Sequence, residues 1–127
     1  GIEPPPGEPE ALAEKWAAEL DRNGVDRAAL IASLPGDESS VSRAVAAHPS
    51  RFRGFYVSNP LAPDAVERLE PVAARKALHA ICVFPAMHRY SIADDRAGPL
   101  LDFAERSNAP VFVHCGVLSV GIRGKLG

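Results

Sequence analysis

Residues 80–114 have the sequence AICVFPAMHRYSIADDRAGPLLDFAERSNAPVFVH, and this stretch decides the fold class. It begins and ends with short apolar runs, Ala80–Phe84 and Pro110–His114, which are typical of buried strands. Between the two runs, a segment with apolar residues at helical spacing begins at Pro99. Two strands separated by a helix in this way predict a unit in which the strands pair in parallel.

The same alternation extends toward the N-terminus. Apolar runs at Ala28–Leu34 and Phe52–Val57 predict two more strands. Apolar residues at helical spacing predict helices over 12–20, 41–48 and 63–72. The predicted order is therefore α-β-α-β-α-β-α-β, with the strands about 24 to 30 residues apart along the chain.

Particular residues predict where these elements begin, end or break. Asn23-Gly24 is expected to end the first helix, and Trp16 is expected to belong to the core. Pro71 is expected to kink or split the third helix. A polar loop is predicted from Pro85 through Asp95, with Asp94-Asp95 as the cap region of the next helix.

The strand pattern leaves two architectures, an open doubly wound sheet and a (β/α)8 barrel. Nearly continuous apolar strands fit a parallel sheet that is covered on both faces. The sequence contains neither GxGxxG nor GxxxxGK[ST], so nucleotide-binding open sheets lose their main support. A complete barrel needs ~250 residues. We therefore predict an α/β fold that is a partial (β/α)8 TIM barrel, with about four βα units and sequential order of the parallel strands.

Length and composition restrict the class of protein. The 127 residues suffice for one domain, and 46% apolar with 24% charged residues is typical of a soluble globular protein. Intrinsic disorder, collagen and disulfide-rich mini-proteins are thereby excluded. The net charge of −2 gives no electrostatic reason to bind nucleic acid or an acidic membrane. No apolar stretch approaches the ~20 residues of a membrane span.

The cysteines and the two ends of the sequence complete this first description. Cys82 and Cys115 form no disulfide framework, and we interpret them as reduced thiols of a cytosolic protein, with one bridge left open. The sequence begins at Gly1 without a methionine and stops at Gly127 in a loop-like stretch. We expect residues 1–127 to be a single-domain fragment of a longer chain.

His114 is the first candidate for chemistry, because it ends an apolar strand where the active sites of parallel folds lie. Alternation along the strand places His114 and Phe112 on one face. A neutral imidazole in that position is a good Zn²⁺ ligand. The alternative is a histidine that caps the strand through hydrogen bonds to a neighbouring strand.

The loop after the third predicted strand is the second candidate. His88, Arg89 and Tyr90 offer an acid/base group, a fixed cation and an amphipathic ring for substrate binding. The alternative is a solvated loop with Tyr90 packed at its base. His48 and His79 are expected at the opposite end of the strands, where residues serve stability. Neighbours in a strand point to opposite faces, which argues against a His114–Cys115 dyad.

Four segments together resemble the amidohydrolase-related (amidohydrolase-2) family, which includes metal-dependent hydrolases and the aminocarboxymuconate-semialdehyde and resorcylate decarboxylases. Gly24–Leu30 resembles the second-strand region of that family, and His48–Phe55 resembles the approach to its third strand. Ala80–Tyr90 resembles its fourth strand and the following loop. Pro110–Gly116 resembles its fifth strand, which carries a histidine metal ligand.

The resemblance implies that the chain forms strands two to five of an eight-stranded TIM barrel. It implies that His114 is a ligand of a divalent metal, most simply zinc, and that His88 and Arg89 line the substrate mouth. The His-x-His pair of the family's first strand does not occur in this sequence, and its sixth-strand His and eighth-strand Asp would lie beyond Gly127. Some related barrels use a carboxylated lysine on the fourth strand, but Ile81–Phe84 contains no lysine, so a binuclear site is not expected. A single ligand does not retain a metal, so we expect no metal in this chain alone.

The resulting functional hypothesis is a metal-dependent hydrolase that acts on a small organic substrate bearing a carboxylate or an amide, with the fragment inactive by itself. A non-oxidative decarboxylase of the same family is one alternative. A metal-free barrel isomerase or aldolase with His114 as acid/base is another, and a non-catalytic α/β binding module is a third. The expected partner is the small-molecule substrate, with neither nucleic acid nor membrane. A half barrel leaves open edges and an open inward face near Phe112, so homo-oligomers are also expected.

Overall fold

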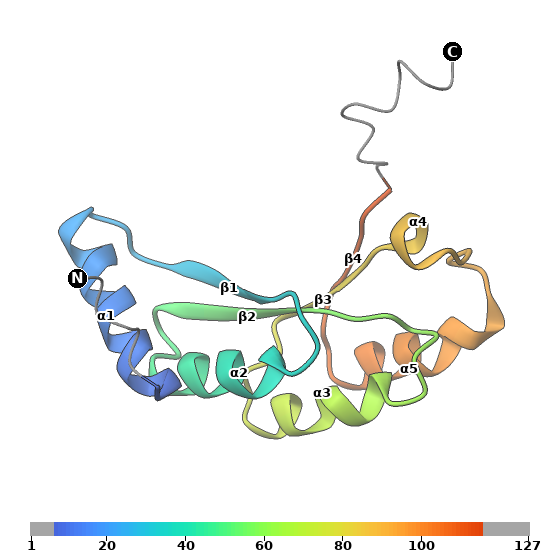
Figure 1. Cartoon of the computed structure of the whole chain (residues 1–127), viewed down its shortest axis with the longest axis horizontal. Helices are drawn as coiled ribbons and strands as arrows, with labels where there is room; N and C mark the ends of the chain where they lie inside the picture. Colours follow the sequence, from blue (N-terminus) through green and yellow to red (C-terminus); the bar gives the residue numbers. More distant parts are fainter. Residues whose placement is uncertain (1–6, 116–127) are drawn as a thin grey trace, which may run out of the picture.

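The computed structural model describes residues 7–115, in which helices and parallel strands alternate (Figure 1). The strands are β1 (Ala28–Ala32), β2 (Phe52–Val57), β3 (Ala80–Val83) and β4 (Val111–Val113). The helices are α1 (Pro9–Arg22), α2 (Asp37–Ala47), α3 (Ala65–Ala74), α4 (Pro85–His88) and α5 (Gly98–Arg106), with a 3-10 turn η1 (Asp95–Ala97). The predicted α/β class and the predicted order of elements are confirmed.

The four strands form one sheet in the order β1-β2-β3-β4, and every neighbouring pair is parallel. Ile31 lies opposite Phe55, and Cys82 lies opposite Val57 on one side and Phe112 on the other. The sequential order predicted from the sequence is confirmed. A strand order that reverses direction, as in a doubly wound sheet, is absent from residues 7–115.

The two faces of the sheet have different surroundings. Helices α2, α3 and α5 lie along one face (Figure 1), where Phe52, Tyr56 and Ile81 are fully buried. On the other face Ile31 is 57% exposed and Phe112 is 56% exposed. Within residues 7–115 the sheet is covered on one face only, because these three helices lie on the same side, and the face with Phe112 is open as expected. We call the uncovered side the open face.

The first helix packs through small residues rather than through its tryptophan. Ala13 and Ala17 are buried against the core, whereas Trp16 is 40% exposed. Small side chains let α1 approach α2 closely, so the larger indole lies at the rim and contacts Phe52 edge-on at 6.5 Å. The prediction that Trp16 belongs to the core is wrong. The predicted helix end is confirmed, with Asn23 as the C-cap and Gly24 at φ 65°.

The third helix continues as one element through its proline. Pro71 lies inside α3, and its carbonyl still accepts the Arg75 N–H at 3.1 Å. The missing N–H costs about 3 kcal/mol in a helix interior. Leu69 and Val72, on either side of the proline, are buried in the core and offset that cost. The expected split of this helix is therefore wrong.

The predicted polar loop after β3 contains two short helical turns. Pro85 begins α4, since a proline loses nothing at the first helical position. Arg89, with φ 56°, ends α4 in the left-handed conformation. The expectation of a continuous loop is wrong here, but the cap is confirmed, because Asp94 accepts the Arg96 N–H at 2.9 Å.

A close approach between β2 and the segment before β3 depends on Gly54. A Cβ at this position would collide with the carbonyl oxygen of Ala77 and with the ring and hydroxyl of Tyr56. The Tyr56 hydroxyl donates to that same Ala77 carbonyl at 3.1 Å, and Tyr56 is fully buried. Gly54 therefore permits a backbone contact that no other residue type allows.

Candidate functional site

The carboxyl ends of parallel strands meet at one edge of a sheet, and two cavities lie beside the strand ends here. The first, which we call the edge cavity, measures about 280 Å³ and lies between the first turns of α2 and α3 and the short helix α4. The second, the face cavity, measures about 270 Å³ and lies on the open face. The two cavities share no lining residue.

The face cavity is lined almost entirely by apolar and aromatic side chains. Its lining residues are Phe55, Cys82, Phe84, Phe112, Val113 and His114. The rings of Phe55 and Phe112 stack with centroids 5.8 Å apart, and the imidazole of His114 stacks on Phe84 at 5.0 Å. His114 and Phe112 line the same cavity, as their alternate positions along the strand predict.

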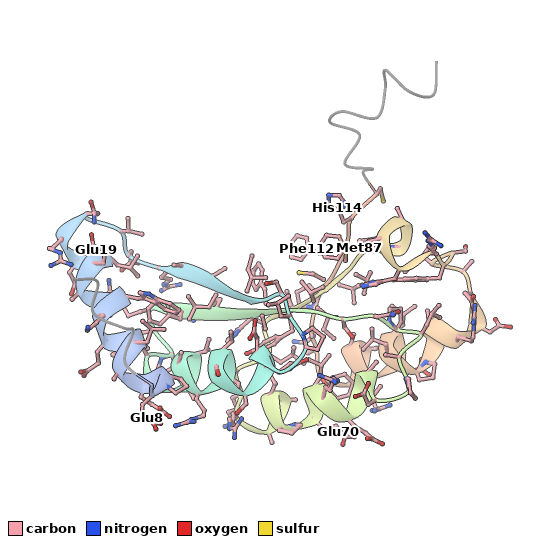
Figure 2. All side chains as sticks on the ribbon, in the orientation of Figure 1. Glu8, Glu19, Glu70, Met87, Phe112 and His114 are labelled. Atoms are coloured by element: carbon pink, nitrogen blue, oxygen red, sulfur yellow. The ribbon has the colours of Figure 1, made fainter. Side chains whose placement is uncertain are left out.

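His114 follows β4 directly and is exposed (Figure 2). Its backbone N–H donates to the Val83 carbonyl at 2.9 Å, which continues the pairing of β3 with β4. Neither ring nitrogen has a hydrogen-bond partner within residues 7–115, so the imidazole does not cap the strand through its ring there. Within that range, the ring nitrogens are available to a ligand or a metal.

The described residues around His114 do not form a complete zinc site. Zinc in proteins takes three or four nitrogen, sulfur or carboxylate ligands. Within the part of the chain that the structure describes, no three histidine, cysteine, aspartate or glutamate side chains are close enough to hold a metal ion. These residues supply one candidate ligand, and a metal centre would need further ligands from outside them.

The edge cavity has a polar wall built around Arg68. The Arg68 guanidinium contacts Asp64 at 2.7 Å and Glu38 at 3.6 Å, and it thereby joins the first turn of α2 to α3. The hydrogen bond with Asp64 holds the pKa of Arg68 above its ordinary value. The second carboxylate oxygen of Glu38 accepts the Gly36 N–H at 2.8 Å. The polar lining also includes Ser33, Ser58, Asn59 and His88.

The three residues proposed for substrate binding lie apart from His114. His88 ends α4 and lines the edge cavity, but its Nδ1 is buried without a hydrogen-bond partner in residues 7–115. The Tyr90 hydroxyl is likewise buried without a partner among those residues, and burial raises its pKa. Arg89 is exposed. Of the three, only His88 lines either cavity beside the strand ends, and it does not share one with His114.

The other histidines lie at the opposite end of the strands, as the sequence predicts. His48 follows α2 and contacts Phe52 edge-on at 6.0 Å. His79 precedes β3, and its Nδ1 accepts the Gly54 N–H at 3.0 Å. Partial burial lowers the pKa of His79, and the positive charge of Arg53 lowers it further. The neutral imidazole, with its proton on Nε2, is therefore part of the fold at this end.

His79 gives the fold a testable pH dependence. Because its folded pKa is lowered, the unfolded chain binds more protons, and the free energy of unfolding falls as the pH drops from about 7 to 5.5. Over that interval ordinary carboxyl groups remain ionised. Urea unfolding at several pH values measures the slope. His79→Gln keeps an acceptor for Gly54 without a titrating ring, so it should flatten the slope, whereas His48→Gln should not. An unchanged slope in His79→Gln contradicts the assignment.

The two cysteines remain free thiols in separate surroundings. Cys82 is half-buried on the open face, and burial raises the pKa of its thiol. Cys115 is exposed, and its Sγ lies 3.6 Å from the Val113 carbonyl oxygen. No hydrogen bond joins Cys115 to the ring of His114 within residues 7–115. Among the described residues, no cationic group or metal ligand cluster that would activate either thiol is hydrogen-bonded to it.

The sequence did not single out the edge cavity as a site. Asp64 and Arg68 are one helical turn apart, but Glu38 comes from a different helix and reaches them only because α2 and α3 pack side by side. One signal was available: Ser58 and Asn59 directly follow an apolar strand, which places polar groups at the carboxyl edge of the sheet.

Comparisons with known proteins identify no relative. No protein-family model, curated protein or solved structure matches this chain. Within residues 7–115, no helix is both long and apolar enough to cross a membrane.

Proposed function

We propose that this chain is part of a TIM-barrel hydrolase that depends on a divalent metal and is related to the amidohydrolase family. The observation that carries the proposal is the open face. Four parallel strands in sequential order expose Ile31 and Phe112 on the side opposite the helices. That arrangement is expected of a barrel segment, whose inward side chains are covered only by the remaining strands.

His114 has the position that this function requires. It follows β4 on the open face, which would be the inside of the barrel, and its ring nitrogens are free to coordinate. A bound metal in such an enzyme polarises a substrate oxygen or lowers the pKa of a water to ~7. Phe84 stacks against His114 and limits the orientations of the imidazole. The other ligands would come from outside the described residues.

The aromatic lining of the face cavity constrains the substrate. Phe55 and Phe112 present apolar rings beside the imidazole, and none of the described residues that line the cavity carries a carboxylate. A small organic molecule with an apolar part and one carboxylate or amide group suits these walls. A cytosolic, reducing location agrees with two free thiols and is part of the same proposal.

Substitution of His114 tests the proposed ligand role in the full-length protein. His114→Ala should lower bound metal, measured by mass spectrometry, by about tenfold or more and abolish turnover at the same time. His48→Ala, at the other end of the strands, is the matched control and should change neither. Full metal occupancy in His114→Ala would falsify the ligand assignment.

The free ring nitrogens of His114 also favour a second candidate, a metal-free barrel isomerase or aldolase in which His114 transfers protons. That function predicts lost turnover in His114→Ala with no metal in either protein. Analysis of the reaction products separates a hydrolase from a non-oxidative decarboxylase, because the decarboxylase releases carbon dioxide whereas the hydrolase consumes water. A His114 with only a structural role predicts a lower melting temperature with normal activity in the folded fraction.

A further inference from the structure

The edge cavity contains a hydroxyl group that the fold leaves unused. Ser58 is 9% exposed, directly follows β2 and lines the cavity. Its backbone N–H donates to the Cys82 carbonyl at 3.0 Å, and its Oγ is neither sealed from solvent nor hydrogen-bonded to another of residues 7–115. The hydroxyl is therefore available as a donor and as an acceptor to a molecule that enters the cavity.

Other unused polar groups border the same space. Ser33 contributes a second hydroxyl group from the end of β1. Asn59 accepts the Leu61 N–H with its Oδ1 at 3.0 Å, which leaves its amide nitrogen available as a donor. His88 closes the cavity from the side of α4. A bound molecule would therefore meet both hydrogen-bond donors and acceptors.

The charges in the cavity select against ionic ligands. Glu38 and Asp64 carry two negative charges, and Arg68 lies between them with one positive charge. An anion would face this net negative charge. A cation would have to displace a guanidinium that already contacts both carboxylates. A neutral molecule with several hydroxyl groups avoids both costs and can use the free carboxylate lone pairs as acceptors.

The size and the apolar walls of the edge cavity restrict the class of ligand further. A volume of about 280 Å³ lies just below the range for small-molecule pockets, which begins at ~300 Å³. Val57, Leu69 and Met87 add apolar surface to the polar lining. A compact molecule that carries both C–H and O–H groups matches such a cavity.

We propose that the edge cavity binds a small neutral polyol, of monosaccharide size or smaller, through the Ser58 hydroxyl and the Glu38–Arg68–Asp64 group. The proposal goes beyond the hydrolase function and does not rest on it, because the edge cavity shares no lining residue with the face cavity that contains His114. The polyol would be held beside the strand ends, next to the first turns of α2 and α3.

Titration of the full chain with defined probes tests the proposal. myo-Inositol and glucose serve as neutral polyols, with inorganic phosphate and ethylammonium as charged probes. In ¹H–¹⁵N NMR spectra, a neutral polyol should shift the amide resonances of Ser58, Asn59 and His88, and the charged probes should not. Shifts with phosphate or ethylammonium alone, shifts elsewhere alone, or no shift with either polyol overturn the proposal.

Substitution of a residue that lines the edge cavity provides a second test of the proposal. Ser58→Ala should weaken polyol binding about fivefold to tenfold, which is the loss expected for one neutral hydrogen bond of about 1 kcal/mol. Ser107→Ala, at the end of α5, is the control and should bind normally. If Ser58→Ala fails to fold, Ser33→Ala supplies the same comparison from an exposed position. Unchanged affinity in the folded cavity variant contradicts the assigned site.

Discussion

Gly54→Ala is expected to destabilise the chain by about 3 kcal/mol and to lower its melting temperature by roughly 10 °C. The added methyl group would collide with the Ala77 carbonyl oxygen and with Tyr56, and neither can withdraw easily. The carbonyl belongs to backbone next to β3, and Tyr56 is fully buried with its hydroxyl bonded to that carbonyl. Circular dichroism during heating measures the effect.

Gly98→Ala is the matched control for this substitution. Nothing lies within 4 Å of a Cβ built at Gly98, which begins α5 with φ −52°. Alanine is favoured over glycine in helices by up to about 1 kcal/mol, so this variant should melt at the same temperature or slightly higher. Equal melting temperatures for the parent chain and Gly54→Ala would show that the backbone moves to make room.

The open face is expected to make the chain of 127 residues self-associate. Ile31 and Phe112 each expose more than half of their surface on that face. Covering a few hundred Å² of apolar surface at ~25 cal/mol per Å² contributes several kcal/mol, which is comparable to the stability of a domain. Size-exclusion chromatography with light scattering should find dimers or larger species at micromolar concentration.

Polar substitution on the open face should reverse this association. The double variant Ile31→Thr, Phe112→Thr removes the two most exposed apolar side chains of the open face and should lower the association constant at least tenfold. Val25→Thr replaces an apolar residue that is 41% exposed but lies before β1, and it should associate like the parent chain. A parent chain that is monomeric and unfolds in one sharp calorimetric transition contradicts the expectation.

The strands could be predicted because each one is a mainly apolar run with a proline, a glycine or polar residues close to its end. The prediction was most accurate for β2, whose predicted and observed bounds are both Phe52–Val57. The sequential order of the strands could also be predicted from the sequence, because a single short helix connects strands that are neighbours in a parallel sheet. Whether the sheet closes as a barrel depends on strands beyond the described residues, and barrel closure stays a prediction.

The errors have a common physical origin in tertiary packing. Helical spacing identified the apolar stripe of α1 that contains Trp16. The close packing of α1 against α2 decides which side chains of that stripe are buried, and these are Ala13 and Ala17 rather than Trp16. Local propensity predicted a break at Pro71, but burial of Leu69 and Val72 outweighs it. Both outcomes depend on neighbours that are distant in sequence, which periodicity does not report.

The candidate site could be predicted only in part, because some of its contacts also depend on tertiary packing. His114 lies at a strand end on the face shared with Phe112, which alternation along the strand is sufficient to predict. The ion pairs of Arg68 join residues from two helices and need the packed structure to be seen. His88 and His114 both follow strands, yet the turn of α4 directs His88 to a different cavity.

The sequential order of the strands also has a consequence for synthesis on the ribosome. Within residues 7–115, each strand pairs only with the strands that precede and follow it along the chain, so every inter-strand contact there closes a loop of about thirty residues or fewer. A loop of this length costs less entropy to close than the longer loops of a sheet with a different strand order. The sheet can therefore grow in one direction as the chain emerges, with β1 and β2 paired before β4 has been translated.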